Sequence, residues 1–285
     1  MSIFDDWKFW TVLYLICSIT FAQTFKKANR NAKDLGNLTI LLEIFTALFA
    51  IIFIPFFAIN FPTDIETYLH LLIVVILYAF VDRLNVEARY GIDPSVFSML
   101  KQLSTVFLMI FGFIFLKEEP VITRIVGAII IISANILLSI DKGKIKINKY
   151  FIMSFISNFL FAVAMLINVN ISSQFNLAIY TIFTVSIPAL LIFLFGRHSI
   201  RGLIKEFNLY SKTKFLVSAF CWALMLISSV KAYQVGSVAV IAPILTLTSV
   251  LNTFYEFLVL KNKNQVLQKI ICSIMIIIGV LLIKM

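Results

Sequence analysis

Long apolar runs separated by short polar breaks make up almost the whole chain. A helix needs about 20 apolar residues to cross the hydrocarbon core of a bilayer, and ten runs of roughly this length are present. The runs cover residues 9–25, 37–60, 68–88, 92–116, 121–140, 149–169, 175–195, 214–235, 237–260 and 266–284. The pattern predicts an all-α integral membrane protein with ten transmembrane helices, and only the break at 196–214 is long enough for a short surface helix.

The sequence resembles itself after a shift of 144 residues, which aligns spans three and four with spans eight and nine. The shift pairs Ala88 with Ala232 and Phe113 with Phe257. Five spans in each half is an odd number, so the second half enters the membrane from the opposite side. We therefore expect two inverted five-helix repeats, residues 1–145 and 146–285.

The charges indicate an orientation rather than a nucleic-acid partner. Of the 285 residues 61% are apolar and 13% charged, and the net charge is +10. Seventeen basic residues, Arg89 and Lys269 among them, fall in the odd-numbered loops and their flanks, against five at the other ends of the spans. The positive-inside rule then places both termini outside the cytoplasm, and a cell membrane is the expected location.

Four charged residues lie close to the middle of spans two to four: Glu43, Asp82, Arg83 and Lys101. From the helical rise they lie roughly 5 to 8 Å from the midplane, all on the side of the odd-numbered loops. Intramembrane charges normally face a partner or a wet cavity. The sequence predicts one charged layer in which Glu43 or Asp82 pairs with Lys101 or Arg83.

This layer has a functional and a structural interpretation. In the first it is a binding or gating site, with Lys101 contacting an anionic group and Glu43 holding a proton or cation. In the second it is an ion-pair lock between helices. Trp222, near the middle of span eight, is a candidate cavity residue, and Pro243 is a candidate functional kink in span nine.

Catalytic and metal-binding patterns are absent from the sequence. Cys17, Cys221 and Cys272 each lie within an apolar run, and neither His70 nor His198 has a ligand partner at helical spacing. No glycine-rich phosphate loop precedes a Lys-Ser/Thr pair. We therefore expect no cofactor, no metal and no enzymatic activity.

Three short segments carry a family resemblance: 95–105 (SVFSMLKQLST), 115–119 (FLKEE) and 124–127 (RIVG). They resemble the drug/metabolite transporter superfamily, particularly its EamA-type members, and 236–238, 260–261 and 279–280 look like a second copy. The resemblance implies a ten-span fold and a transport role, but not the cargo. The second copy has Asn262-Lys263 in place of Glu118-Glu119, so no role of that acidic pair is carried over.

The leading hypothesis is a secondary transporter of a small metabolite, working by alternating access between the repeats. Its expected partners are the lipid bilayer, the substrate and a coupling proton or cation, and a homodimer stays open. The segment 100–105 also resembles the fourth span of nucleotide-sugar transporters, which leaves exchange of nucleotide sugars or phosphorylated metabolites as an alternative. An integral-membrane enzyme or scaffold for lipid-linked substrates is the alternative of another class.

Overall fold

A computed structural model describes residues 6–115, 121–141, 144–145, 148–236, 238–259, 261 and 265–284. The fold is a bundle of α-helices, and helices occupy each of the predicted apolar runs. The helices of the first half are α1 (Trp7–Ala28), α2 (Leu35–Ile51), α3 (Ile65–Gly91), α4 (Pro94–Leu100), α5 (Leu103–Phe115) and α6 (Ile122–Ser139). Those of the second half are α7 (Lys149–Ile171), α8 (Leu177–Phe195), α9 (Ile200–Phe207), α10 (Lys212–Val235), α11 (Val238–Leu258) and α12 (Val266–Lys284).

Several of these helices suit a bilayer by length and composition. Within the described residues six helical stretches are long and apolar enough to cross a membrane, with α4 and α5 together forming one of them. Three shorter apolar helices lie at 35–51, 122–138 and 244–258. The chain is therefore an integral, multi-pass membrane protein, as the sequence predicts.

Polar residues mark where the helices begin. The side chains of Asp34, Asp64, Asn148 and Asn176 each accept a hydrogen bond from a backbone N–H in the first turn of α2, α3, α7 and α8. Such caps satisfy donors that have no partner inside the helix. The breaks between apolar runs thus start the next helix as well as ending the last.

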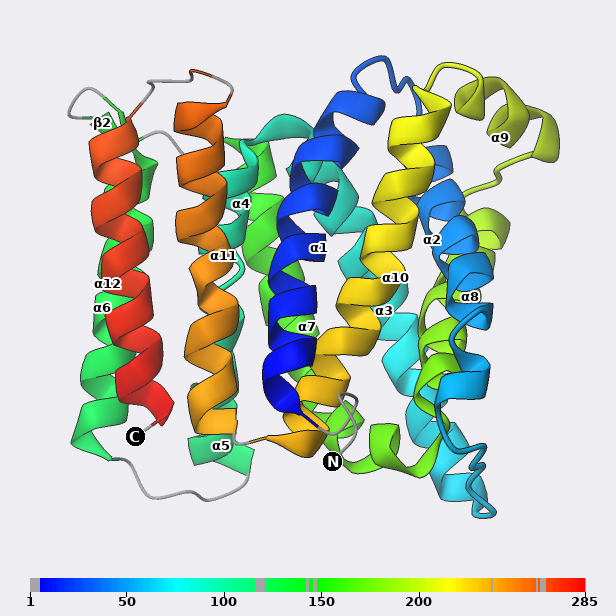
Figure 1. The fold of residues 1–285 in the computed structure, drawn as a ribbon, viewed down its shortest axis with the longest axis horizontal. Helices are drawn as coiled ribbons and strands as arrows, with labels where there is room; N and C mark the ends of the chain where they lie inside the picture. Colours follow the sequence, from blue (N-terminus) through cyan, green and yellow to red (C-terminus); the bar gives the residue numbers. More distant parts are fainter. Residues whose placement is uncertain are drawn as a thin grey trace.

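The long helices run side by side between two faces of the molecule, and both termini lie on one face (Figure 1). Helix α1 packs on α10, α3 on α7, α2 on α8, and α6 on α12. Helix α9 lies on the face opposite the termini (Figure 1), where the sequence predicts a surface helix. Glu43, Asp82 and Trp222, from α2, α3 and α10, lie inside this bundle.

Two predicted spans differ in detail. Helix α2 ends at Ile51, nine residues before the predicted end at 60. A short 3-10 helix at Ile54–Phe56 follows, and it contains Pro55, which has no backbone N–H for a continued α-helix. Span four is two helices, α4 and α5, interrupted at Lys101 and Gln102. A two-residue strand pair, Ile140–Asp141 with Lys144–Ile145, also departs from a purely helical fold.

Candidate functional site

A polar stripe on α3 forms the floor of a small internal cavity. Tyr78, Asp82, Asn85 and Arg89 follow one another at spacings of four, three and four residues, which places them on one face of the helix. Asp82, Asn85 and Arg89 line the cavity directly. The serine hydroxyl of Ser157 on α7 donates to the Asn85 Oδ1 at 2.8 Å and so holds the amide in place.

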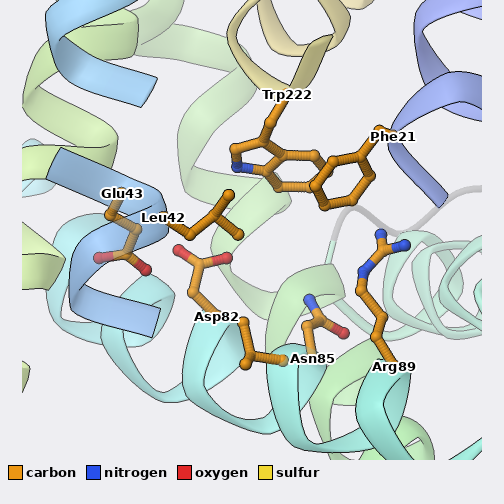
Figure 2. A pocket seen from close by; sticks show the side chains of 8 residues that line it. Phe21, Leu42, Glu43, Asp82, Asn85, Arg89 and Trp222 are labelled. Atoms are coloured by element: carbon orange, nitrogen blue, oxygen red, sulfur yellow. The ribbon is translucent and has the colours of Figure 1, made fainter. Parts of the chain in front are cut away.

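The remaining walls come from three other helices. Phe21 of α1, Leu42 and Glu43 of α2, and Trp222 of α10 surround the stripe (Figure 2). The cavity volume is about 10 Å³, the room of about one water molecule. Residues from both halves of the chain therefore enclose one polar space.

Two carboxyl groups face each other across this space (Figure 2). Glu43 is 1% exposed, and neither of its carboxylate oxygens has a hydrogen-bond partner among the described residues. The Asp82 carboxyl lies beside it, close enough for the two groups to interact. A buried carboxylate without donors is costly, and two such charges side by side repel each other.

The Arg89 guanidinium lies among aromatic rings at the other end of the cavity. Its central carbon is 3.9 Å from the ring centroid of Phe97, 4.8 Å from that of Phe21 and 5.4 Å from that of Trp222. Phe21 and Trp222 are themselves stacked, with centroids 4.8 Å apart. These ring faces attract the cation, and Asp82 lies within Coulombic range to balance its charge.

Lys101 lies at the break between α4 and α5. The Leu100 carbonyl oxygen accepts a hydrogen bond from the Asn158 side chain of α7 at 3.0 Å, and the Lys101 carbonyl oxygen accepts from the Ser104 hydroxyl at 2.7 Å. These bonds satisfy backbone groups near the interruption, as a buried break requires. The Lys101 ammonium lies 5.9 Å from the Phe161 ring centroid, within Coulombic range of Arg89 and Asp82.

A second charged cluster joins helix ends on the face that carries the odd-numbered loops, which we call the odd-loop face. Lys269 of α12 donates to Glu256 of α11 at 3.0 Å and to Asp93 at 3.2 Å, and both Lys269 and Glu256 are 3% exposed. The backbone N–H and hydroxyl of Ser95 donate to the Glu256 carboxylate at 2.9 and 2.7 Å. Lys26 of α1 completes the cluster with an ion pair to Asp93 at 2.9 Å.

Asp93 lies outside the helices, in the connection between α3 and α4. Burial by itself raises the pKa of this carboxyl, but the hydrogen bonds and charges of Lys26 and Lys269 outweigh burial and hold the pKa below its ordinary value of 3.8. Asp93 is therefore ionised at neutral pH. We name Lys26, Asp93, Ser95, Glu256 and Lys269 the end cluster.

The structure brings together part of the predicted charged layer. Glu43, Asp82 and Trp222 line one cavity, and Lys101 lies near it. The expected pairing of Arg83 with Glu43 or Asp82 is wrong: Arg83 pairs with Glu87 at 2.7 Å, because residues four apart share a helix face. The ionisable side chain that acts on Glu43 is the acid Asp82 and not one of the expected cations. Pro243 lies within α11, which continues through it.

Two further candidate residues are missed when every basic residue near a loop is counted only as a signal of membrane orientation. Arg89 and Lys269 count as loop cations in the sequence, yet Arg89 lines the cavity and Lys269 is buried. The spacing of Asp82, Asn85 and Arg89 along α3 is the signal that identifies the stripe. Glu118 and Glu119, which carry part of the family resemblance, lie outside the described residues.

Comparisons with known proteins concern the fold of the whole chain and the family of residues 8–140. No curated protein matches the sequence. A solved structure, described only as the crystal structure of a protein, has a TM-score of 0.53 at 10% identity, over 96% of this chain and 97% of its own. At that identity the likeness concerns the fold alone. Residues 8–140 match the sequence model described as the EamA-like transporter family. Over these residues, which make up a little less than half of the chain, the sequence is similar to the EamA-like membrane transporters of the drug/metabolite transporter type.

Proposed function

We propose that this chain is a secondary transporter that moves a small metabolite by alternating access between two inverted five-helix repeats, residues 1–145 and 146–285. The observation that carries the proposal is the buried carboxyl group of Glu43, which has no hydrogen-bond donor among the described residues and faces Asp82 in a cavity built from both halves. A charged carboxylate inside the membrane is costly. Such a residue is therefore a candidate for binding a proton, a cation or a substrate during function.

The packing of the helices supports the repeat. The contact of α1 with α10 has a counterpart in α7 with α3, and that of α2 with α10 has one in α8 with α3. Likewise α1 with α11 corresponds to α7 with α5, while α2 with α8 and α6 with α12 pair equivalent helices. Exchanging the halves therefore maps the contacts onto one another, as expected of an internal two-fold axis.

The carboxyl pair supports ion coupling. Glu43 and Asp82 face each other without intervening donors, so a shared proton, or a cation in its place, relieves their repulsion. In this mechanism the proton leaves when substrate binds and returns when the cavity opens to the opposite side. The expected coupling ion is a proton.

Contacts between the two halves on both faces of the molecule support alternating access. On the odd-loop face the end cluster ties α1 and the start of α4 to α11 and α12. On the opposite face the side chain of Asn176, which caps the start of α8, donates to the carbonyl oxygens of Phe57 and Ala58, at 2.9 and 3.0 Å. The end cluster and the Asn176 hydrogen bonds each join the two halves. Opening toward one side therefore requires the contacts on that side to break while those on the other side stay intact.

The test uses purified protein in proteoliposomes that contain a pH-sensitive dye. Candidate amino acids, amines, sugars and nucleotide sugars are first selected by thermal shift, and saturable uptake of a selected compound then identifies transport. Glu43→Gln is expected to reduce proton-coupled uptake at least tenfold, because the amide cannot exchange a proton. Glu87→Gln, which changes an acid paired outside the cavity, is the matched control. Equal coupled uptake by both variants would remove Glu43 from the mechanism.

Exchange of nucleotide sugars or phosphorylated metabolites is the second candidate, favoured by the two cations, Arg89 and Lys101, beside the cavity. This candidate is supported if nucleotide sugars raise the melting temperature of the wild-type protein and Lys101→Met abolishes that increase. A lipid-directed enzyme would form a product from a lipid substrate. A scaffold would show neither product formation nor saturable uptake.

A further inference from the structure

The surface helix α9 presents an unusual combination of exposed groups. It connects α8 to α10 on the face opposite the termini, and lies at one side of the bundle (Figure 1). Ser199 caps its start by accepting a hydrogen bond from the Gly202 N–H at 3.1 Å. Its eight residues, Ile200–Phe207, have apolar and charged side chains on different faces.

One face of α9 is fixed to the bundle. The Phe207 ring stacks on Phe45 of α2 with centroids 5.3 Å apart, and its centroid is 5.7 Å from that of Phe215 of α10. The Glu206 carboxylate, 5% exposed, accepts hydrogen bonds from the Lys33 N–H at 2.7 Å and the Tyr210 hydroxyl at 3.2 Å. The helix therefore has a defined orientation relative to the transmembrane helices.

The outer face combines exposed apolar side chains with exposed cations. Ile200 is 69% and Ile204 58% exposed, and Phe195 at the end of α8 is 83% exposed. Arg201 and Lys205 on α9, with Arg197 just before it, are exposed too. The only acid of α9 is the buried Glu206. No exposed acidic side chain of α9 lies beside these cations.

We propose that α9 and the end of α8 form a binding surface for anionic phospholipids. Ile200, Ile204 and Phe195 enter the boundary between headgroups and acyl chains, while Arg197, Arg201 and Lys205 contact lipid phosphates. Apolar groups beside cations are the features by which surface helices bind anionic membranes. Because α9 packs on α2, which carries Glu43, a lipid bound here stabilises the helix that forms one wall of the cavity.

The first experiment compares lipid retention and thermal stability in nanodiscs of phosphatidylcholine alone or mixed with phosphatidylglycerol. The wild-type protein is expected to retain phosphatidylglycerol, seen by native mass spectrometry, and to melt at a higher temperature in the mixed discs. Each neutralised cation should weaken retention by on the order of fivefold, so Arg197→Gln, Arg201→Gln and Lys205→Gln together should abolish the difference between the two discs.

The matched control removes three exposed cations elsewhere, through Lys8→Gln, Lys27→Gln and Lys149→Gln. It changes the net charge equally and should keep most of the lipid effect. Equal losses in the two triple variants would mean that only general charge attracts the lipid, which overturns a specific surface at α9.

The second experiment locates the apolar face in the membrane. Cys17, Cys221 and Cys272 are buried, so a spin label attached at Ile204→Cys reports mainly on that position. The label is expected to be more accessible to oxygen, which partitions into lipid, than to a water-soluble nickel complex, and a label at Lys205→Cys should show the reverse. A label at 204 accessible mainly to nickel, or shielded from both by a second protein molecule, would refute the lipid surface. Neither result depends on transport, so the proposed function stands or falls separately.

Discussion

At the scale of single residues, the cavity brings together groups that are each expensive to bury. Glu43 has no hydrogen-bond donor among the described residues. The Arg89 guanidinium lies against aromatic ring faces instead of water. A transporter needs such groups in a reversible state, because a site whose polar atoms are all satisfied by protein has little affinity left for a ligand. The unsatisfied carboxyl is thus more informative about function than the well-paired charges nearby.

Arg89 and Arg83 offer a direct comparison on one helix. Replacing Arg89 by Met should lower the free energy of unfolding by about 3 kcal/mol or more, because it removes the cation that offsets buried Asp82. Replacing Arg83 by Met breaks a partly exposed pair with Glu87, for which a loss of about 0.3 to 0.5 kcal/mol is typical. Thermal unfolding of both variants in detergent measures the difference. Equal losses would show that Arg89 has no special electrostatic role.

At the scale of elements, the end cluster joins helix ends that are far apart in the sequence. Lys269→Met should destabilise the protein by about 3 to 5 kcal/mol, since Glu256 is left buried with Ser95 as its remaining donor among the described contacts. Adding Glu256→Leu should restore part of the loss, with a coupling of about 0.5 to 3 kcal/mol. If the cluster also closes the cavity, Lys269→Met should make a cysteine placed at Val86, a cavity-lining residue of α3, react faster with an impermeant thiol reagent applied from the side of the odd-numbered loops. Destabilisation without faster labelling would leave only a structural lock.

Helices α6 and α12 approach each other at a pair of glycines. A Cβ added at Gly127 would lie 2.5 Å from the Gly279 carbonyl oxygen, which is too close without separating the helices. We expect Gly127→Ala to cost about 1 to 3 kcal/mol of stability. Gly202→Ala is the control: the nearest atom is the Ser199 hydroxyl oxygen at 3.1 Å, and Ala is favoured over Gly within a helix. Gly127→Ala without loss of stability would mean that the helices separate at little cost.

At the scale of the whole molecule, both termini lie on one face and α9 lies on the other (Figure 1). The loop charges predict that the face with the termini is outside the cytoplasm. A reporter that is active only outside the cytoplasm, fused after Met285, should therefore be active. Activity of a cytoplasmic reporter at that position would reverse the orientation and leave the fold unchanged.

The sequence by itself determined the helical membrane class, the breaks between helices and the presence of charges at intermediate depth. These features depend on local hydrophobicity, on capping residues such as Asp34 and Asp64, and on the cost of exposing the backbone to lipid. It also identified Glu43, Asp82 and Trp222 as candidate cavity residues, because charged and polar aromatic groups deep in a span need a protein or aqueous environment.

Only the tertiary structure decided which of these groups meet. The direction of a side chain around its helix axis separates Asp82, which faces the cavity, from Arg83, which is the next residue and pairs with Glu87. Span counting assigns a depth but not this direction, and it cannot show that Glu256 and Lys269 meet Asp93 across helix ends. Partner choice depends on how the helices pack, and that packing is a property of the assembled bundle rather than of any one apolar run.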